Sequence, residues 1–278
     1  MLKFFQKFFN FSKKYKLYYF GGRKNKNAGD IFNKDLVEFF NINYKRVRKI
    51  ENSNLLCVGS NLDKIVNNKK MKKQSITVIG AGFIQPADVE EKITNELNIL
   101  ALRGKISQKR MAKILNNDLS NCLLADPGIL VSKIYPQEIT KTYRLGIIPH
   151  CFDKELVNTI QINLDKNLYT IIDIQQDVKD VVKQICECEC ILSSSLHGLI
   201  FADSYNIPNR QIILSERLAG GSYKFEDYYS AFDLELPYAI DLRKNIIDNN
   251  IIENIINSYL LKNLEAKQNE LINLFKCL

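Results

Sequence analysis

Three consecutive serines and a nearby histidine form the group of side chains best suited to bind an anion and move a proton. They are Ser193, Ser194, Ser195 and His197, and the chain of 278 residues contains only one other histidine. Serine hydroxyls donate hydrogen bonds to oxyanions, and an imidazole gains or loses a proton near neutral pH. The alternative is that the serines cap a helix and that the histidine packs in the core. We interpret the group as a candidate site for an anionic substrate.

The stretch that contains this group, residues 188–208, predicts a buried strand, a tight turn and a helix. Ile191 and Leu192 form an apolar run before the serines, Gly198 opens an apolar segment after them, and Pro208 closes the stretch. In parallel α/β sheets, ligands bind where strands end and the next helices begin. The free N–H groups and the dipole of the helix favour an anion at that place.

A second candidate is Arg103, which lies near the end of a predicted strand over residues 98–104, before a helix predicted from Ser107 onward. A guanidinium binds a carboxylate or a phosphate through two parallel hydrogen bonds, whereas a structural salt bridge is the alternative role. A glycine-containing loop over residues 21–29 follows the predicted first strand. Asp30 would cap the next helix, and the glycines would let the backbone approach a ligand closely.

Alternating strands and helices in both halves of the chain predict an α/β fold with two parallel sheets. A polar stretch with a proline, residues 135–142, separates the halves, so we expect domains over residues 1–138 and 139–278. Residues 245–278 predict long terminal helices. The predicted strands cover residues 17–20, 55–59, 76–83 and 98–104 in the first half and 143–149, 169–174, 191–192 and 210–214 in the second.

Composition excludes several classes of protein. Hydrophobic residues at 46% and charged residues at 25% describe a globular chain, and the net charge of +8 carries little weight because the chain is rich in Lys throughout. The basic residues are dispersed and lack an aromatic–basic recognition motif, so we expect no nucleic-acid partner. Seven cysteines without zinc-site spacing predict neither a disulfide framework nor a metal site. The glycines at residues 80–82 do not form a dinucleotide fingerprint.

Residues 1–14 combine phenylalanines at helical spacing with lysines between them. The lysines interrupt any apolar region, so the segment is not a secretion signal. A basic amphipathic helix of this kind lies in a membrane interface or packs its apolar face on the protein itself. Both alternatives remain open, and the first gives peripheral membrane contact through residues 1–14.

Six segments, in order from Asn27 to Tyr229, resemble motifs of the polysaccharide pyruvyl transferase family. The most characteristic is SSSLHGLIFADSYNIP, which contains the three serines and the histidine. The others are N-x-G-D at residues 27–30, ALRG followed by Ser107, ADPGIL at residues 125–130, GIIPHCFD at residues 146–153 and KFEDYY at residues 224–229.

The resemblance implies two Rossmann-like domains facing a cleft, an arrangement called GT-B-like, with C-terminal helices. It also implies a transferase that moves a pyruvyl group from phosphoenolpyruvate to hydroxyls of a sugar in a cell-surface polysaccharide or its precursor, forms a ketal and releases phosphate. Such an enzyme needs no cofactor beyond its donor substrate. It would be cytoplasmic, or at the inner face of the membrane if the acceptor is lipid-linked.

The chemistry requires a proton donor, cations for the carboxylate and phosphate, and a base for the sugar hydroxyls. The resemblance implies His197 as the general acid and Arg103 as the clamp for the carboxylate or phosphate. Some family members have an arginine where this chain has Ser195, so the positive charge must come from elsewhere, with Arg210, Arg217 and Lys224 as the alternatives. The implied substrate-binding residues are Asn27, Gly29, Asp30, His150, Ser193, Ser194, Ser195, Lys224, Asp227 and Tyr228.

Two other functions remain open. A nucleotide-sugar glycosyltransferase can use the same two-domain shape, because a fold does not determine a function. A non-catalytic module that binds anions or membranes would also explain the positive charge.

Overall fold

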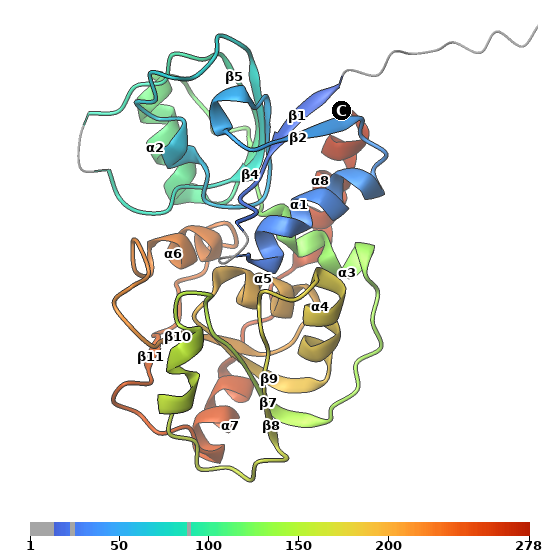
Figure 1. The fold of residues 1–278 in the computed structure, drawn as a ribbon, viewed down its shortest axis with the longest axis vertical. Coiled ribbons are helices and arrows are strands. Elements are labelled where there is room, and N and C mark those ends of the chain that lie inside the picture. The colour runs from blue at the N-terminus through green and yellow to red at the C-terminus, as the bar shows by residue number, and fades with distance from the viewer. Residues whose placement is uncertain (1–13, 23–25, 88–89) are drawn as a thin grey trace, which may run out of the picture.

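The computed structural model describes residues 14–22, 26–87 and 90–278, so the helix expected at residues 1–14 lies almost entirely outside the described residues. The chain forms two sheets, and every strand pair in both sheets is parallel. In Figure 1 one sheet lies in the upper half of the molecule and the other in the lower half. The expected α/β class with two parallel sheets is confirmed.

The first sheet has six strands in the spatial order β2-β1-β3-β4-β5-β6. Their bounds are β1 Tyr15–Tyr18, β2 Tyr44–Val47, β3 Leu55–Leu56, β4 Ile76–Ala81, β5 Leu97–Leu102 and β6 Leu123–Leu124. The second sheet has five strands in the order β11-β10-β9-β7-β8. Their bounds are β7 Tyr143–Ile148, β8 Tyr169–Ile171, β9 Cys188–Ser193, β10 Asn209–Ile213 and β11 Ile240–Asp241.

Helices connect and cover these strands. They are α1 Ala28–Phe39, α2 Lys105–Leu115, α3 Val131–Ile134, α4 Val178–Cys186, α5 Leu196–Ser204, α6 Tyr223–Ser230, α7 Asn249–Ser258 and α8 Leu264–Lys276. α4 is amphipathic and buries Val178, Val181, Val182 and Ile185 on one face. All nine residues of α5 are buried, as expected for a helix without a polar face.

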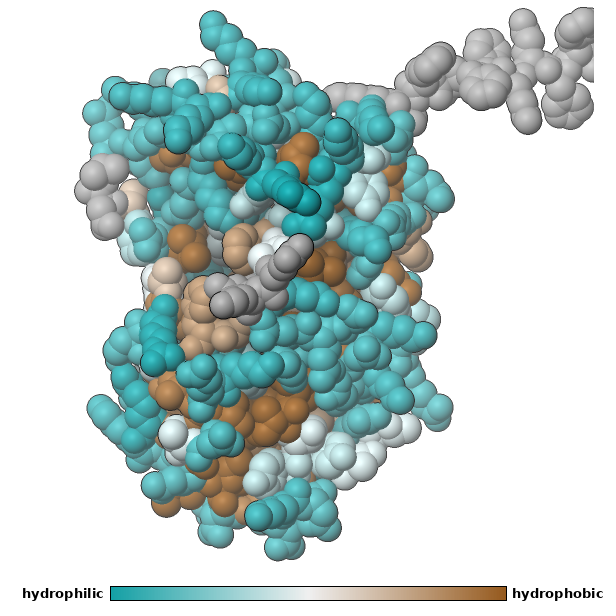
Figure 2. Space-filling model, in the orientation of Figure 1, coloured by the Kyte–Doolittle hydropathy of each residue, from teal (hydrophilic) through white to brown (hydrophobic). Residues whose placement is uncertain are grey.

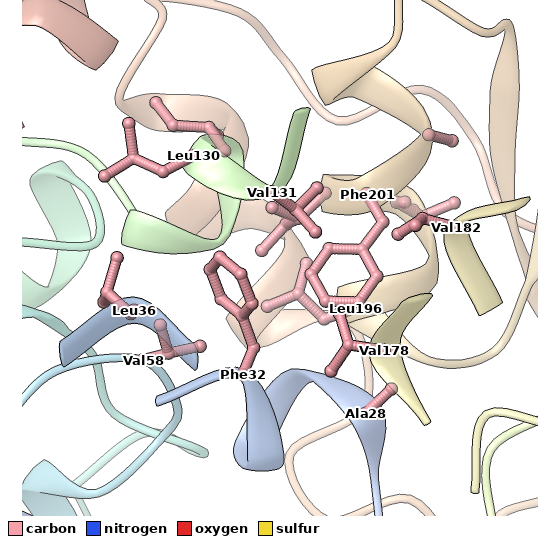
Figure 3. Close-up of a cluster of buried hydrophobic side chains, with 14 of the residues drawn as sticks. Ala28, Phe32, Leu36, Val58, Leu130, Val131, Val178, Val182, Leu196 and Phe201 are labelled. Carbon is pink, nitrogen blue, oxygen red and sulfur yellow. The ribbon is translucent and has the colours of Figure 1, made fainter. Parts of the chain in front are cut away.

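The two halves of the chain share a hydrophobic core. Phe32 and Leu36 of α1 belong to the same buried cluster as Val178 of α4 and Phe201 of α5, as Figure 3 shows. The rings of Phe32 and Phe201 meet edge to face with their centres 5.8 Å apart. The burial of this shared surface stabilises the arrangement of the two sheets, since apolar area removed from water favours the packed state.

The C-terminal helix α8 returns to the first half of the chain. Lys267 donates a hydrogen bond to the carbonyl of Leu124 at 2.7 Å, and Gln268 donates one to the carbonyl of Ile129 at 2.7 Å. The ring of Phe275 stacks on that of Phe40 with centres 5.1 Å apart. The chain therefore crosses between the halves more than once.

Most predicted strands and helices lie where the sequence placed them, although three strands were not predicted. β2 has the polar sequence YKRV, and β6 and β11 contain two residues each, so none of them has the apolar run on which strand prediction depends. All seven cysteines are free, and α4 ends at Cys186 before β9 begins at Cys188. Within the described residues no helix is long and apolar enough to cross a membrane.

Candidate functional site

A cavity of about 250 Å³ lies where strands of both sheets end and the following helices begin. In the first half of the chain its lining residues are Phe20, Asn27, Asp30, Gly59, Ser60, Asn61, Lys64, Ile84 and Arg103. In the second half they are residues 150–152, residues 195–197 and Lys224. Ligands of parallel α/β sheets bind at this edge, so the position of the cavity marks a candidate substrate site.

The first turn of α1 holds the first turn of α5 in place. Asn27 is the N-cap of α1: its side-chain oxygen accepts from the Gly29 amide at 2.9 Å, and its side-chain amide donates to the Ser195 hydroxyl at 3.2 Å. Gly29 lies against the ring of His197, and a Cβ atom at this position would be only 1.9 Å from the Cγ of His197. The N-x-G-D motif therefore positions the serine–histidine stretch of the other half.

His197 is a neutral imidazole in this setting. Its Nε2 is buried and has no hydrogen-bond partner among the described residues. Burial, together with the nearby charges of Lys224 and Arg103, lowers the pKa of His197 to about 3. A buried polar atom without a partner is costly, so a ligand that supplies one would be stabilised here.

The second histidine, His150, also lines the cavity. The amide of Phe152 donates to its Nδ1 at 3.3 Å, so the neutral ring carries its proton on Nε2. Its own backbone amide donates to the hydroxyl of Ser194 at 2.8 Å. Burial, with a smaller effect from Lys224, lowers the pKa of His150 to about 4. His150 can therefore donate a hydrogen bond through Nε2 without carrying a charge.

Three cations line the cavity: Lys64, Arg103 and Lys224. Within the described residues, Lys224 makes no hydrogen bond or ion pair through its ammonium group, and burial lowers its pKa to about 8. Lys64 donates only to neutral oxygens, the Tyr18 hydroxyl at 3.3 Å and the Asn61 side chain at 3.1 Å. Two of the three cations are thus available to an anionic ligand.

Arg103 is more constrained, because its guanidinium is fully buried and donates three hydrogen bonds to the protein. Nε pairs with Asp227 at 2.9 Å, Nη1 donates to the Ser60 hydroxyl at 2.7 Å, and Nη2 donates to the carbonyl of Phe83. Gly82 makes room for this group, because a Cβ there would lie 2.4 Å from the Arg103 Cζ. Two of the five N–H donors of the guanidinium remain for a ligand.

Two carboxyl groups, those of the partly buried Asp30 and the buried Asp126, lie near these cations. Burial raises the pKa of Asp30 to about 6, although Lys64 and Lys224 oppose the shift. Burial likewise raises the pKa of Asp126 to about 6, and the amide of Gly128 and Arg103 act in the opposite direction. Because Asp30 lines the cavity, its carboxyl group is placed to accept a proton from a substrate.

The structure brings together most of the residues that the sequence selected. Asn27, Asp30, Arg103, His150, Ser195, His197 and Lys224 line the cavity. Ser193 and Ser194 lie behind it: the Ser193 hydroxyl donates to the carbonyl of Ile148, and Ser194 supports the backbone of His150. Gly29 contacts His197, and Asp227 holds Arg103 and accepts from the Ser107 hydroxyl at 2.6 Å.

Tyr228 is not among the residues that line the cavity. Its hydroxyl donates to Asp203 at 2.9 Å in a buried cluster that also contains Lys262 and Tyr259. Conversely, Phe20, Lys64 and Phe152 line the cavity but were not predicted as site residues. Lys64 follows the predicted strand at residues 55–59, so a search beyond that strand end would have found it.

A protein-family model described as polysaccharide pyruvyl transferase matches residues 1–212 of the chain. An uncharacterized protein of Acanthamoeba polyphaga mimivirus is 31% identical over 225 residues, which cover 76% of this chain and 73% of that protein. The succinoglycan biosynthesis protein ExoV of Rhizobium meliloti (strain 1021) is 25% identical over 211 residues, which cover 76% of this chain and 63% of ExoV.

Two solved structures show weak similarity. One is a functionally uncharacterized protein from Klebsiella pneumoniae, with 12% identity and a TM-score of 0.46 over 77% of this chain and 87% of that chain. The other is the wall teichoic acid polymerase TagF, with 9% identity and a TM-score of 0.40 over 95% of this chain and 84% of that chain. Similarities of this size carry no functional argument.

Proposed function

Because the chain belongs to the polysaccharide pyruvyl transferase family, and is therefore a transferase, we propose that it moves a pyruvyl group from phosphoenolpyruvate to two hydroxyls of a sugar. The product is a cyclic ketal, and phosphate is released. The similarity to ExoV, a succinoglycan biosynthesis protein, supports a polysaccharide or its precursor as the acceptor.

The observation that carries this proposal is a buried histidine, His197, whose Nε2 has no hydrogen-bond partner among the described residues, in a cavity lined by three cations. Phosphoenolpyruvate carries a carboxylate and a phosphate, which need cations and N–H donors. Lys64 and Lys224 supply unpaired ammonium groups, and Arg103 supplies its two remaining donors. Lys64 is our candidate for the positive charge that other family members carry at the position of Ser195.

His197 would act as the general acid. The bound anion would raise the pKa of the imidazole above its value of about 3 in the free site, so the proton would enter with the substrate. His197 then protonates the methylene carbon of phosphoenolpyruvate while a sugar hydroxyl adds to C2. The C2–O bond to phosphate next breaks, and the second hydroxyl closes the ketal.

The reaction also requires a base, because the two sugar hydroxyls lose their protons. The two hydroxyls lose two protons, of which one replaces the proton that His197 gave to the new methyl group and one leaves with phosphate. Asp30 lines the cavity with a pKa of about 6, so its carboxylate is placed to accept a hydroxyl proton. Asn27 and Gly29, beside it, would position the acceptor side of the site.

The cavity of about 250 Å³ is lined by three cations, which suits the carboxylate and phosphate of phosphoenolpyruvate. We further propose that the two sheets belong to separate GT-B-like domains, residues 1–138 and 139–278, with the substrates between them. The cavity supports this division, because both halves line it.

Incubation with phosphoenolpyruvate and a panel of sugar acceptors tests the proposal. Phosphate should appear together with an acceptor whose mass has increased by one pyruvate less one water. General acid catalysis contributes about 100- to 10,000-fold, so His197→Asn should lower turnover by that factor while the melting temperature stays near that of the wild type. Normal turnover in a folded variant would remove His197 from the mechanism, and release of a nucleotide from a nucleotide-sugar donor would contradict the proposal.

A further inference from the structure

The two halves of the chain carry opposite net charges. Residues 1–138 contain 25 Lys and Arg against 12 Asp and Glu, which gives a formal charge of +13. Residues 139–278 contain 14 Lys and Arg against 19 Asp and Glu, which gives −5. A general bias toward lysine would make both halves positive, so bias alone does not explain this difference. Charge asymmetry of this kind indicates an interaction with an anionic partner.

Nine exposed cations of the first half form what we call the basic face. They lie just before and on β1, on and just after β2, and in the segment before β4. Its members are Lys14, Lys16, Lys45, Arg48, Lys49, Lys69, Lys70, Lys72 and Lys73.

Local geometry places these cations near one another. Lys16 and Lys45 are paired residues of the neighbouring parallel strands β1 and β2, so their side chains project from the same side of the sheet. The backbone amide of Lys72 donates a hydrogen bond to the carbonyl of Glu51. The lysine-rich segment before β4 therefore lies beside the residues that follow Lys49. Figure 1 shows β1 and β2 at the end of the molecule remote from α7, and Figure 2 shows a mainly hydrophilic surface over this upper half.

The basic face is not neutralised by the protein. Within the described residues, none of its nine members makes an ion pair. Ion pairs do form elsewhere in the molecule, for example at Arg103, Arg144 and Arg243. The charge of the basic face is therefore available to a partner.

We propose that the basic face binds the surface of an anionic lipid bilayer. Each lysine or arginine close to such a surface strengthens binding about fivefold, so nine together suffice for peripheral attachment. The net negative charge of the second half would be repelled, which orients the molecule with its first half toward the lipid. This inference rests on described residues and is independent of the proposed chemistry.

The observations favour lipid over nucleic acid. Single-stranded nucleic acid is usually held by aromatic side chains that stack on its bases, and between residues 41 and 75 no large aromatic side chain is exposed. The basic face consists of strand and loop residues and contains no helix that could enter a major groove. None of its members lines the cavity described above.

Vesicle flotation of the full chain tests the proposal. We expect binding to vesicles of equimolar phosphatidylcholine and phosphatidylglycerol, weak binding to phosphatidylcholine alone, and loss of binding at high salt. The quadruple variant Lys45→Gln/Lys49→Gln/Lys70→Gln/Lys73→Gln should lower the partition coefficient at least about 100-fold. Unchanged binding of this variant, or equal binding of the wild type to both vesicles, would overturn the proposal.

A matched variant removes the same charge from the other half: Lys166→Gln/Lys179→Gln/Lys183→Gln/Lys244→Gln, four exposed lysines that make no ion pair with the described residues. It should bind vesicles about as well as the wild type, and an equal loss in both variants would overturn the proposal by showing that only total charge matters. A short RNA and a short duplex DNA, titrated at the same salt concentration, complete the test. Tighter binding to either than to the anionic vesicles would also overturn it.

Discussion

Gly29, in the first turn of α1, lies directly against the imidazole of His197, in the first turn of α5. A Cβ atom on Gly29 would be 1.9 Å from the Cγ and 2.0 Å from the Nδ1 of His197. Two motifs separated by 168 residues thus meet at one contact, and any larger side chain at position 29 must displace the ring. The contact explains why a glycine stands at this position without any requirement from the backbone conformation.

Gly29→Ala should therefore disturb catalysis more than folding. Displacement of a reacting group by about 1 Å costs on the order of 100-fold in turnover, so we expect a loss of that size in phosphate release. A double-mutant cycle with His197→Gly provides the control, because glycine removes the ring and also the Cβ of residue 197, which would otherwise lie 2.5 Å from the new methyl group. In that background the further loss should be small, and a full additional loss would show that Gly29 acts independently of His197.

The buried pair between Arg103 and Asp227 should be essential for stability. Both side chains are fully buried, and removal of one charge leaves the other unpaired, at a cost of roughly 3–5 kcal/mol in the free energy of unfolding. Asp227→Asn, followed by urea denaturation, measures this cost. The exposed pair of Lys105 and Asp233 serves as the control, and Asp233→Asn should leave the urea midpoint unchanged. Equal midpoints for the two variants would contradict a structural role for the buried pair.

The low pKa of His197 predicts a specific dependence of stability on pH. Between its usual pKa of about 6.5 and its folded pKa of about 3, the unfolded chain binds a proton that the folded chain does not. The free energy of unfolding therefore falls as the pH falls through this window. His197→Asn removes this dependence. Between pH 7 and pH 4 its free energy of unfolding should therefore rise by on the order of 3 kcal/mol relative to that of the wild type.

Urea denaturation of both proteins at several pH values measures this difference. Asp30 and Asp126 have raised pKa values and act in the opposite direction, but both proteins contain them, so their effect cancels in the comparison. His150, with a pKa lowered to about 4, also remains in both. If the free energies of unfolding of the variant and the wild type changed in parallel with pH, His197 would titrate as it does in water.

Much of the site could be predicted from sequence, because its residues follow strand ends that apolar runs reveal. The stretch from β9 to α5 is the clearest case: Ile191 and Leu192 predicted the strand, and the serines and His197 fell at its end. Arg103 was placed at the end of β5 in the same way. The choice between its two roles could not be made, since the position of Asp227 depends on tertiary packing across 124 residues.

The orientation of α6 shows where sequence reasoning stops. Lys224, Asp227 and Tyr228 share one face by their spacing, yet each meets a different partner. Lys224 reaches the cavity, Asp227 pairs with Arg103, and Tyr228 joins Asp203 in the core. Lys64 was missed for another reason: it lies five residues beyond the predicted strand at residues 55–59, and several other lysines follow it closely in the sequence.

The central claim, that this cavity binds phosphoenolpyruvate through the ammonium groups of Lys64 and Lys224, is tested most directly by calorimetric titration. The wild type should bind phosphoenolpyruvate, and Lys64→Met and Lys224→Met should each weaken binding about 10- to 100-fold, because each removes a charge-assisted hydrogen bond. Lys70→Met, an exposed lysine outside the cavity, should bind as the wild type does. No binding by the folded wild type, or unchanged affinity in both cavity variants, would contradict the account.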